Sequence, residues 1–76
     1  MASGDNNRTD DVRADIVQLL LDKVAGDPYP SVTMMDLVEE MLGPDDRADY
    51  AAVLMDKVRS DQFPSLDMLV RLRNLT

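Results

Sequence analysis

The sequence predicts an all-α protein: one compact four-helix domain made of two tandem helix–loop–helix repeats with pseudo-two-fold symmetry. Three observations predict this fold. Apolar residues recur at helical spacing, proline-containing breakers interrupt them, and the two halves of the chain align with each other. A chain of 76 residues has room for a single domain, which we place at residues 9–76.

The repeat appears when the chain is offset against itself by 34 residues. Residues 11–42 then align with residues 45–76 without a gap, and twelve of the 32 aligned pairs are identical. Both units begin Asp-x-Arg-Ala-Asp and close their first helix with Asp-Lys-Val. Agreement at this level indicates a duplication, so two similar α-hairpins are expected to bury their apolar faces against each other.

The first helix is predicted from about Asp11 to Ala25, with Thr9 or Asp10 as its cap. The polar residues 1–8 before it are expected to be disordered. A helical wheel groups carboxylates on one side and gives the helix a wide apolar face. That face, which we expect to be buried, comprises Val12, Ile16, Val17, Leu19, Leu20, Leu21 and Val24.

The segment Gly26–Pro30 ends this helix, because proline removes an amide donor and blocks helical continuation. Ser31 is predicted to cap a second helix from about Val32 to Leu42. Gly43 suits a left-handed residue just past its end, and Pro44 suits the first turn of a third helix.

The second unit repeats this plan. Its first helix is predicted from about Asp45 to Ser60, and the fourth helix of the chain from about Leu66 to Asn74, capped by Ser65. Because the connections are short, consecutive helices are expected to be neighbours.

An aromatic-Pro-Ser loop motif occurs in both units. The six residues are Tyr29, Pro30, Ser31, Phe63, Pro64 and Ser65. In the structural interpretation, each ring closes the end of its hairpin, the proline sets the chain direction and the serine caps the next helix. The alternative is that Tyr29 or Phe63 is an exposed anchor for a partner, because aromatic residues dominate binding hot spots.

Two arginines at equivalent positions, Arg13 and Arg47, fall in the first turns of their helices. We expect each to donate to the last carbonyls of the following helix, or to pair with Glu39 or Glu40.

Methionine is frequent for so small a chain, and thioethers fill core gaps or form adaptable binding grooves. Met34 and Met68 occupy equivalent positions, which favours the core. Met35 and Met41 are expected to border a groove.

The two units differ most in their second helices. Leu37 aligns with Arg71, and Asp36 aligns with Val70. The earlier helix is acidic, whereas the later one is basic through Arg71 and Arg73. These surfaces have three possible uses: to face each other within the fold, to join two molecules, or to bind separate partners.

Composition excludes several function classes. A net charge of −7 argues against direct binding to nucleic acid or to an anionic membrane. The chain has no histidine and no cysteine, so we expect no metal, no cofactor and no catalytic site. The polar N-terminus lacks a signal-peptide pattern, and no apolar run approaches the roughly 20 residues that span a bilayer. These features predict a cytoplasmic protein.

The leading hypothesis is a non-catalytic protein–protein interaction module, a small adaptor or regulator. Its partner-binding surface is expected on the second and fourth helices, where apolar residues are rimmed by charge. The residues are Met35, Leu37, Glu39, Glu40, Met41, Val70, Arg71 and Arg73. The alternatives are a structural homodimerisation domain, and an acidic decoy that binds a nucleic-acid-binding protein.

Overall fold

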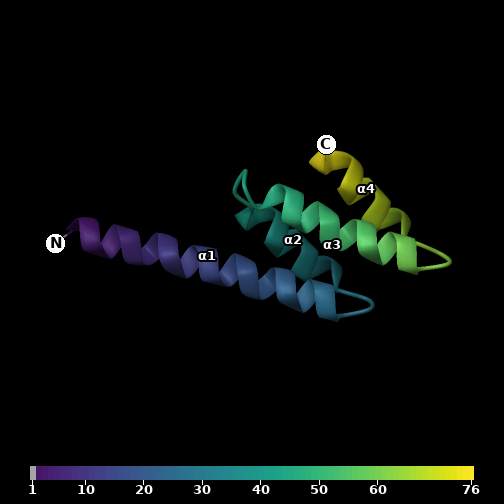
Figure 1. Cartoon of the computed structure of the whole chain (residues 1–76), viewed down its shortest axis with the longest axis horizontal. Helices are drawn as coiled ribbons and strands as arrows, with labels where there is room; N and C mark the ends of the chain where they lie inside the picture. The colour runs from purple at the N-terminus through teal and green to yellow at the C-terminus, as the bar shows by residue number, and fades with distance from the viewer. Residues whose placement is uncertain (1) are drawn as a thin grey trace.

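The computed structural model describes the backbone of residues 2–76 and the side chains of residues 9–76. The described chain forms four α-helices and no strand, which confirms the all-α fold class (Figure 1). The helices are α1 (Ala2–Gly26), α2 (Val32–Met41), α3 (Arg47–Ser60) and α4 (Leu66–Leu75).

The helices form two hairpins. Helix α1 packs against α2, α3 packs against α4, and α1 also packs against α3. Helices α1 and α3 run in the same direction, so the loops at residues 27–31 and 61–65 lie at the same end of the molecule (Figure 1). We call this the loop end. Helices α2 and α4 return from it, and their backbones do not pack closely on each other.

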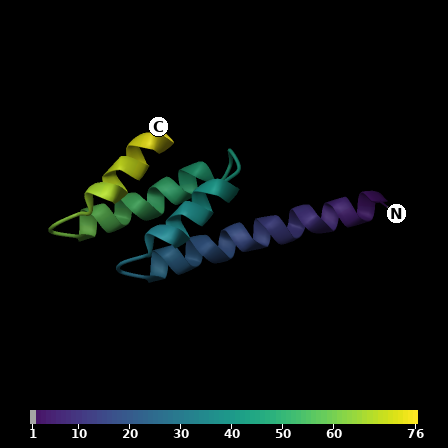
Figure 2. The same ribbon diagram turned by 180° about the vertical axis from the view of Figure 1, so that it is seen from behind.

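Helix α1 begins at Ala2, earlier than the start predicted near Asp11. Thr9 and Asp10 therefore lie inside the helix, and their predicted capping role is wrong. No proline interrupts residues 2–25, and the N-terminal part of α1 extends past the other helices (Figure 2). The side chains of residues 1–8 lie outside the described part of the structure. The disorder predicted for residues 1–8 therefore stays a prediction.

Both serine caps are confirmed. The Oγ of Ser31 accepts a hydrogen bond from the backbone N–H of Met34 at 3.1 Å, and the Oγ of Ser65 accepts one from Met68 at 3.3 Å. Each bond satisfies an amide in the first turn that has no partner within the helix. The repeat-equivalent residues therefore start α2 and α4 in the same way.

The connection between α2 and α3 differs from the prediction. No described glycine has a positive φ, so the left-handed conformation predicted for Gly43 is wrong. Leu42 leaves the helix in an extended conformation, and Gly43 follows it. The carboxylate of Asp46 accepts a hydrogen bond from the N–H of Gly43 at 3.2 Å. Pro44 lies in the resulting turn, and α3 begins at Arg47 instead of about Asp45. A side-chain bond thus closes a turn that the sequence assigned to glycine geometry.

The core lies where the two hairpins meet. Its buried residues are Val17, Leu21 and Val24 of α1, Met35 and Val38 of α2, Tyr50 and Leu54 of α3, and Met68 of α4. Met34 and Met41 are partly buried against it. The core role predicted for Met34 and Met68 agrees with this packing, whereas Met35 is a core residue as well as a groove residue.

The apolar face predicted for α1 is only partly buried. Val12, Ile16 and Leu19 are exposed, although the same wheel predicted all of them to be covered. The reason is that α1 packs closely on two helices, α2 and α3, which cover only one side of it. In the second unit, Tyr50 occupies the position equivalent to Ile16 and is fully buried.

Candidate functional site

The two aromatic loop residues are exposed, so the prediction that they close the hairpin ends is wrong. Tyr29 and Phe63 each have a relative exposure of 82%. In each loop a carboxylate at the helix end holds the turn: Asp27 accepts from the N–H of Tyr29, and Asp61 accepts from the N–H of Phe63, both at 3.0 Å. These matching turns carry both rings outward at the loop end.

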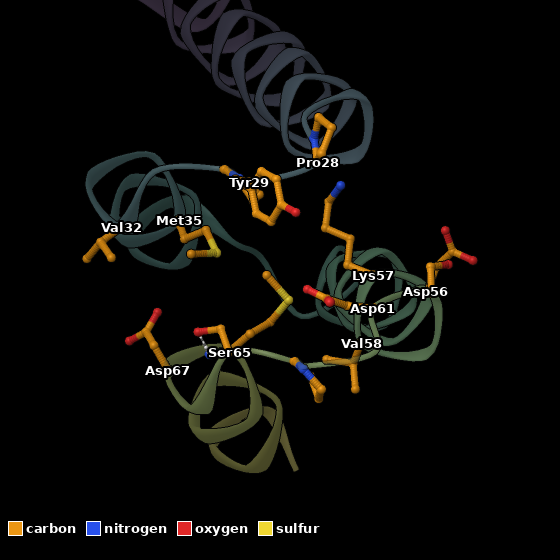
Figure 3. Close-up of a pocket in the computed structure, with 14 residues that line it drawn as sticks. Pro28, Tyr29, Val32, Met35, Asp56, Lys57, Val58, Asp61, Ser65 and Asp67 are labelled. Atoms are coloured by element: carbon orange, nitrogen blue, oxygen red, sulfur yellow. Dashed lines mark hydrogen bonds between the residues drawn. The ribbon is translucent and has the colours of Figure 1, made fainter.

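A cleft of about 470 Å³ opens at the loop end, lined by residues of α2, α3, α4 and the two loops (Figure 3). This volume is in the usual range for pockets that bind small molecules. Apolar residues supply most of its wall: Pro28, Tyr29, Pro30, Val32, Met35, Val58, Pro64 and Met68. Both loops therefore contribute to a single apolar surface.

Met35 from α2 and Met68 from α4 both line this cleft. Both residues are buried, with relative exposures of 3% and 8%. Pro30 is buried beside them, whereas Pro64 is exposed. A methionine-lined wall adapts its shape to the group that enters, because the unbranched side chain is flexible and the sulfur is polarisable.

Lys57 ties α3 to the first loop. Its Nζ donates to the backbone carbonyl of Ala25 at 3.1 Å and to that of Asp27 at 2.5 Å. These carbonyls lie at the C-terminal end of α1, where a positive charge is favourable. The lysine thereby fixes the wall of the cleft and uses two of its three donors within the fold.

Three carboxylates surround the cleft: Asp56, Asp61 and Asp67. Asp61 is occupied by the N–H of Phe63, and Asp67 is paired with Arg71. Asp56 has no hydrogen-bond or ion-pair partner among the described residues, and its side chain points from α3 away from the centre of the cleft (Figure 3). With Lys57 as the one cation lining the described cleft, the rim carries a net negative charge.

The predicted partner-binding surface on α2 and α4 is not brought together as one exposed patch. Met35 and Arg71 are buried and Glu39 is half-buried, and the binding role predicted for the set as a whole stays a prediction. Exposed members of the set are Leu37, Glu40 and Arg73, and half-buried members are Met41 and Val70. Of the eight residues, Met35 alone lines the cleft.

Arg71 is buried because three carboxylates surround its guanidinium. Its Nη1 lies 2.6 Å from Glu39 and 2.9 Å from Asp36, and its Nε donates to Asp67 at 2.7 Å. The acidic α2 and the basic α4 therefore face each other within the fold, one of the three predicted uses of these surfaces. Burial alone would lower the pKa of Arg71, but the hydrogen bonds that its guanidinium donates to Asp67, Glu39 and Asp36 raise the pKa above its ordinary value.

Tyr50 joins the same cluster from α3. Its hydroxyl donates to Glu39 at 2.6 Å, so one carboxylate receives both a phenol and a guanidinium. Burial raises the pKa of Tyr50 well above its ordinary value, and the hydrogen bond to Glu39 raises it further. The cluster links α2, α3 and α4 through side chains.

The role predicted for Arg13 and Arg47 is wrong. Both are exposed, and neither makes a hydrogen bond or ion pair with any described residue. Glu39, one of their predicted partners, pairs with Arg71, which lies in α4 and reaches α2 across the gap between these helices. Arg13 lies well inside α1 and Arg47 at the start of α3, and neither makes a comparable ion pair with a described residue.

Sequence reasoning missed the contribution of Lys57, Val58 and Asp61 to the cleft. A signal was present, because Asp27/Asp61 and Lys23/Lys57 are identical pairs next to the aromatic loops. The same spacing between a helix-end lysine, an aspartate and an aromatic residue in both units indicates a loop with a defined structure. The lysines nevertheless diverge in use, since Lys57 binds the neighbouring loop whereas Lys23 is exposed.

The described side chains contain no group of three or more residues able to ligate a metal ion. None of the helices in the described part of the chain combines the length and apolar character needed to cross a membrane. Comparison with protein-family models, curated proteins and solved structures found no match.

Proposed function

We propose that this protein is a non-catalytic interaction module that binds a partner protein at its loop end. Tyr29 and Phe63 are the anchors of this surface, and the cleft between the loops receives a side chain of the partner. The observation that carries the proposal is that two aromatic rings at repeat-equivalent positions are both 82% exposed beside a mostly apolar cleft.

Exposed aromatic side chains are costly to leave in water and are enriched in binding hot spots. A single exposed ring needs no explanation, but two rings held outward by matching Asp27 and Asp61 turns form an ordered surface. The mostly apolar lining of the adjacent cleft supports the same use.

The proposal is tested by affinity capture with three forms of the protein. The first is the parent, the second carries Tyr29→Ser and Phe63→Ser, and the third carries Val12→Ser and Leu37→Ser. The third form is the matched control, because it removes two exposed apolar residues from positions outside the loop end. Circular dichroism checks that all three forms are folded.

A partner recovered by the parent and the control but lost by the loop variant supports the proposal. Equal recovery by all three folded forms removes the loop end as the binding surface. Loss of the partner with the control variant alone would place the binding surface on α1 and α2.

A second function, self-association, is favoured by a different observation. Val12, Ile16 and Leu19 follow one another at helical spacing along α1 and are exposed. A second copy of the chain that packs on this stripe would bury it. Sedimentation across a concentration series tests this: Ile16→Asp is expected to abolish any dimer, and a parent that stays monomeric at high micromolar concentration excludes it.

A further inference from the structure

We propose that the loop-end cleft receives a positively charged, amphipathic segment of the partner: an apolar side chain enters between Met35 and Met68, and a flanking Lys or Arg lies on the acidic rim. This inference rests on the proposed function and adds the chemistry of the partner. It follows from the charge, the shape and the aromatic content of the cleft.

The charge at the cleft selects for a cation. Asp56, Asp61 and Asp67 line the cleft, and Lys57 is the one cation among the described lining residues. The ammonium of Lys57 is directed to the carbonyls of Ala25 and Asp27 within the fold, away from an incoming ligand. A cationic segment is attracted to this rim, whereas an acidic one is repelled.

The cleft admits an extended apolar side chain but not a folded domain. A volume of about 470 Å³ has room for a protruding side chain but not for a domain, and the buried residues Met35 and Met68 are part of its lining. Unbranched thioethers accept Leu, Met or an aromatic ring with little strain. The partner element is therefore a segment with a protruding apolar residue, such as one face of a helix.

The aromatic anchors favour the same charge. A Lys or Arg that lies over the face of Tyr29 or Phe63 gains a cation–π interaction in addition to its attraction to the carboxylates. Both rings are exposed, so their faces are accessible. The net charge of −7 on the whole chain also steers a basic segment toward the molecule.

The experiment uses two synthetic helical peptides of about three to four turns that differ only in charge. Both carry one Trp as the apolar anchor; the first has Lys at the flanking positions and the second has Glu. The protein contains no tryptophan, so the emission of the peptide Trp reports its burial directly. Titrations with the full chain give Kd at low and at high salt.

Two charge variants of the protein complete the design. Asp56→Asn with Asp61→Asn removes two rim charges; asparagine keeps the side-chain acceptor that holds the Phe63 turn. Asp11→Asn with Asp15→Asn is the matched control, because it removes the same charge from exposed positions on α1. We expect the rim variant to weaken binding of the Lys peptide about tenfold and the control about twofold or less.

Tight binding of the Glu peptide, or equal Kd values for the Lys peptide with rim variant and control, overturns the charge assignment. If Tyr29→Ser with Phe63→Ser still abolishes binding in that case, the proposed function stands and only the partner chemistry fails. If neither peptide binds the parent, the inference fails, while the capture experiment above tests the proposed function independently. Binding of the Lys peptide that is unaffected by the aromatic double variant rejects both.

Discussion

The guanidinium of Arg71 is buried at a position whose equivalent in the first repeat unit is not buried. Its repeat-equivalent residue is Leu37, which is exposed on α2. The position of Arg71 depends on carboxylates from both α2 and α4, so it is satisfied only when the two hairpins are assembled. A buried charge that is fully paired specifies one arrangement of the helices, because any other arrangement leaves it unpaired.

Replacing this arginine should destabilise the fold, because the carboxylates around it lose their positive partner. Arg71→Leu introduces the residue found at the equivalent position and leaves Asp36, Glu39 and Asp67 without their shared cation. We expect a loss of about 2 kcal/mol in the free energy of unfolding. This is below the usual cost for a broken buried pair, because the carboxylates are partly exposed and solvent screens them.

Urea unfolding followed by circular dichroism measures the effect. Adding Glu39→Gln to Arg71→Leu should recover part of the loss, since it removes one of the repelling charges. A double variant no more stable than the single one would attribute the loss to packing and contradict the charge argument.

Tyr50 makes the stability dependent on alkaline pH. Its pKa is higher in the folded protein than the ordinary value near 10. The folded state therefore keeps the phenol proton when the unfolded state has already lost it. This stabilisation is complete below the unfolded pKa and is lost as the pH rises through the folded one.

The variant Tyr50→Phe isolates this contribution. At neutral pH it should lower the free energy of unfolding by about 1.5 kcal/mol, because Glu39 loses a donor. Between pH 8 and about pH 10.5 the parent should lose more stability than the variant. Lysines titrate in both proteins, so the difference between them reports Tyr50, and parallel pH profiles would contradict the assignment.

Among the helices and loops, Lys57 gives the clearest comparison between the two repeat units. It lies in the last turn of α3, as Lys23 lies in the last turn of α1. Both ammonium groups therefore have the same favourable position relative to the dipole of their helix. Only Lys57 also bonds to the loop of the neighbouring hairpin. Its side chain connects α3 to the end of α1 beside the cleft.

The variants Lys57→Met and Lys23→Met separate these two contributions. We expect Lys57→Met to lower the free energy of unfolding by about 1 kcal/mol more than Lys23→Met, because only the former loses bonds to backbone carbonyls. Chemical denaturation of the two single variants side by side makes the comparison. Equal losses would mean that the bonds to Ala25 and Asp27 contribute no net stability.

Helix positions were largely predictable from local sequence. The caps Ser31 and Ser65 and the breaker at Gly26–Pro30 act within a few residues, so their geometry depends little on the rest of the chain. The predicted ends of α2, α3 and α4 differ from the observed ones by one or two residues. The start of α1 was less predictable, because nothing in residues 2–10 forbids a helix.

The candidate site was much less predictable. Exposure of Tyr29 and Phe63 depends on how each loop leaves its helix, which no local pattern specifies. The burial of Arg71 had a usable signal: it lies three residues after the buried Met68 and four after Asp67, on the apolar side of α4. The prediction based on charge alone placed Arg71 on the rim of a binding surface, whereas its helical spacing would have predicted a buried position.

In the whole molecule, the assembly of the hairpins decided which predicted faces were covered. A helical wheel gives the width of an apolar face but not the number of neighbours that pack on it. Helix α1 therefore kept Ile16 and Leu19 exposed, whereas the equivalent Tyr50 and Val53 of α3 are buried or half-buried. The duplication predicted two similar hairpins; their unequal surroundings could not be read from either half alone.

The unequal packing of the helices has a consequence for local unfolding. Helices α1 and α3 each pack closely on two helices, but α2 and α4 each pack closely on one. Segments with fewer tertiary contacts open at lower free energy. Backbone amides of α2 and α4 should therefore exchange with deuterium before those in the buried part of α3 near Leu54, as measured by native-state NMR. Uniform protection across α2, α3 and α4 would show instead that the hairpins open only as one unit.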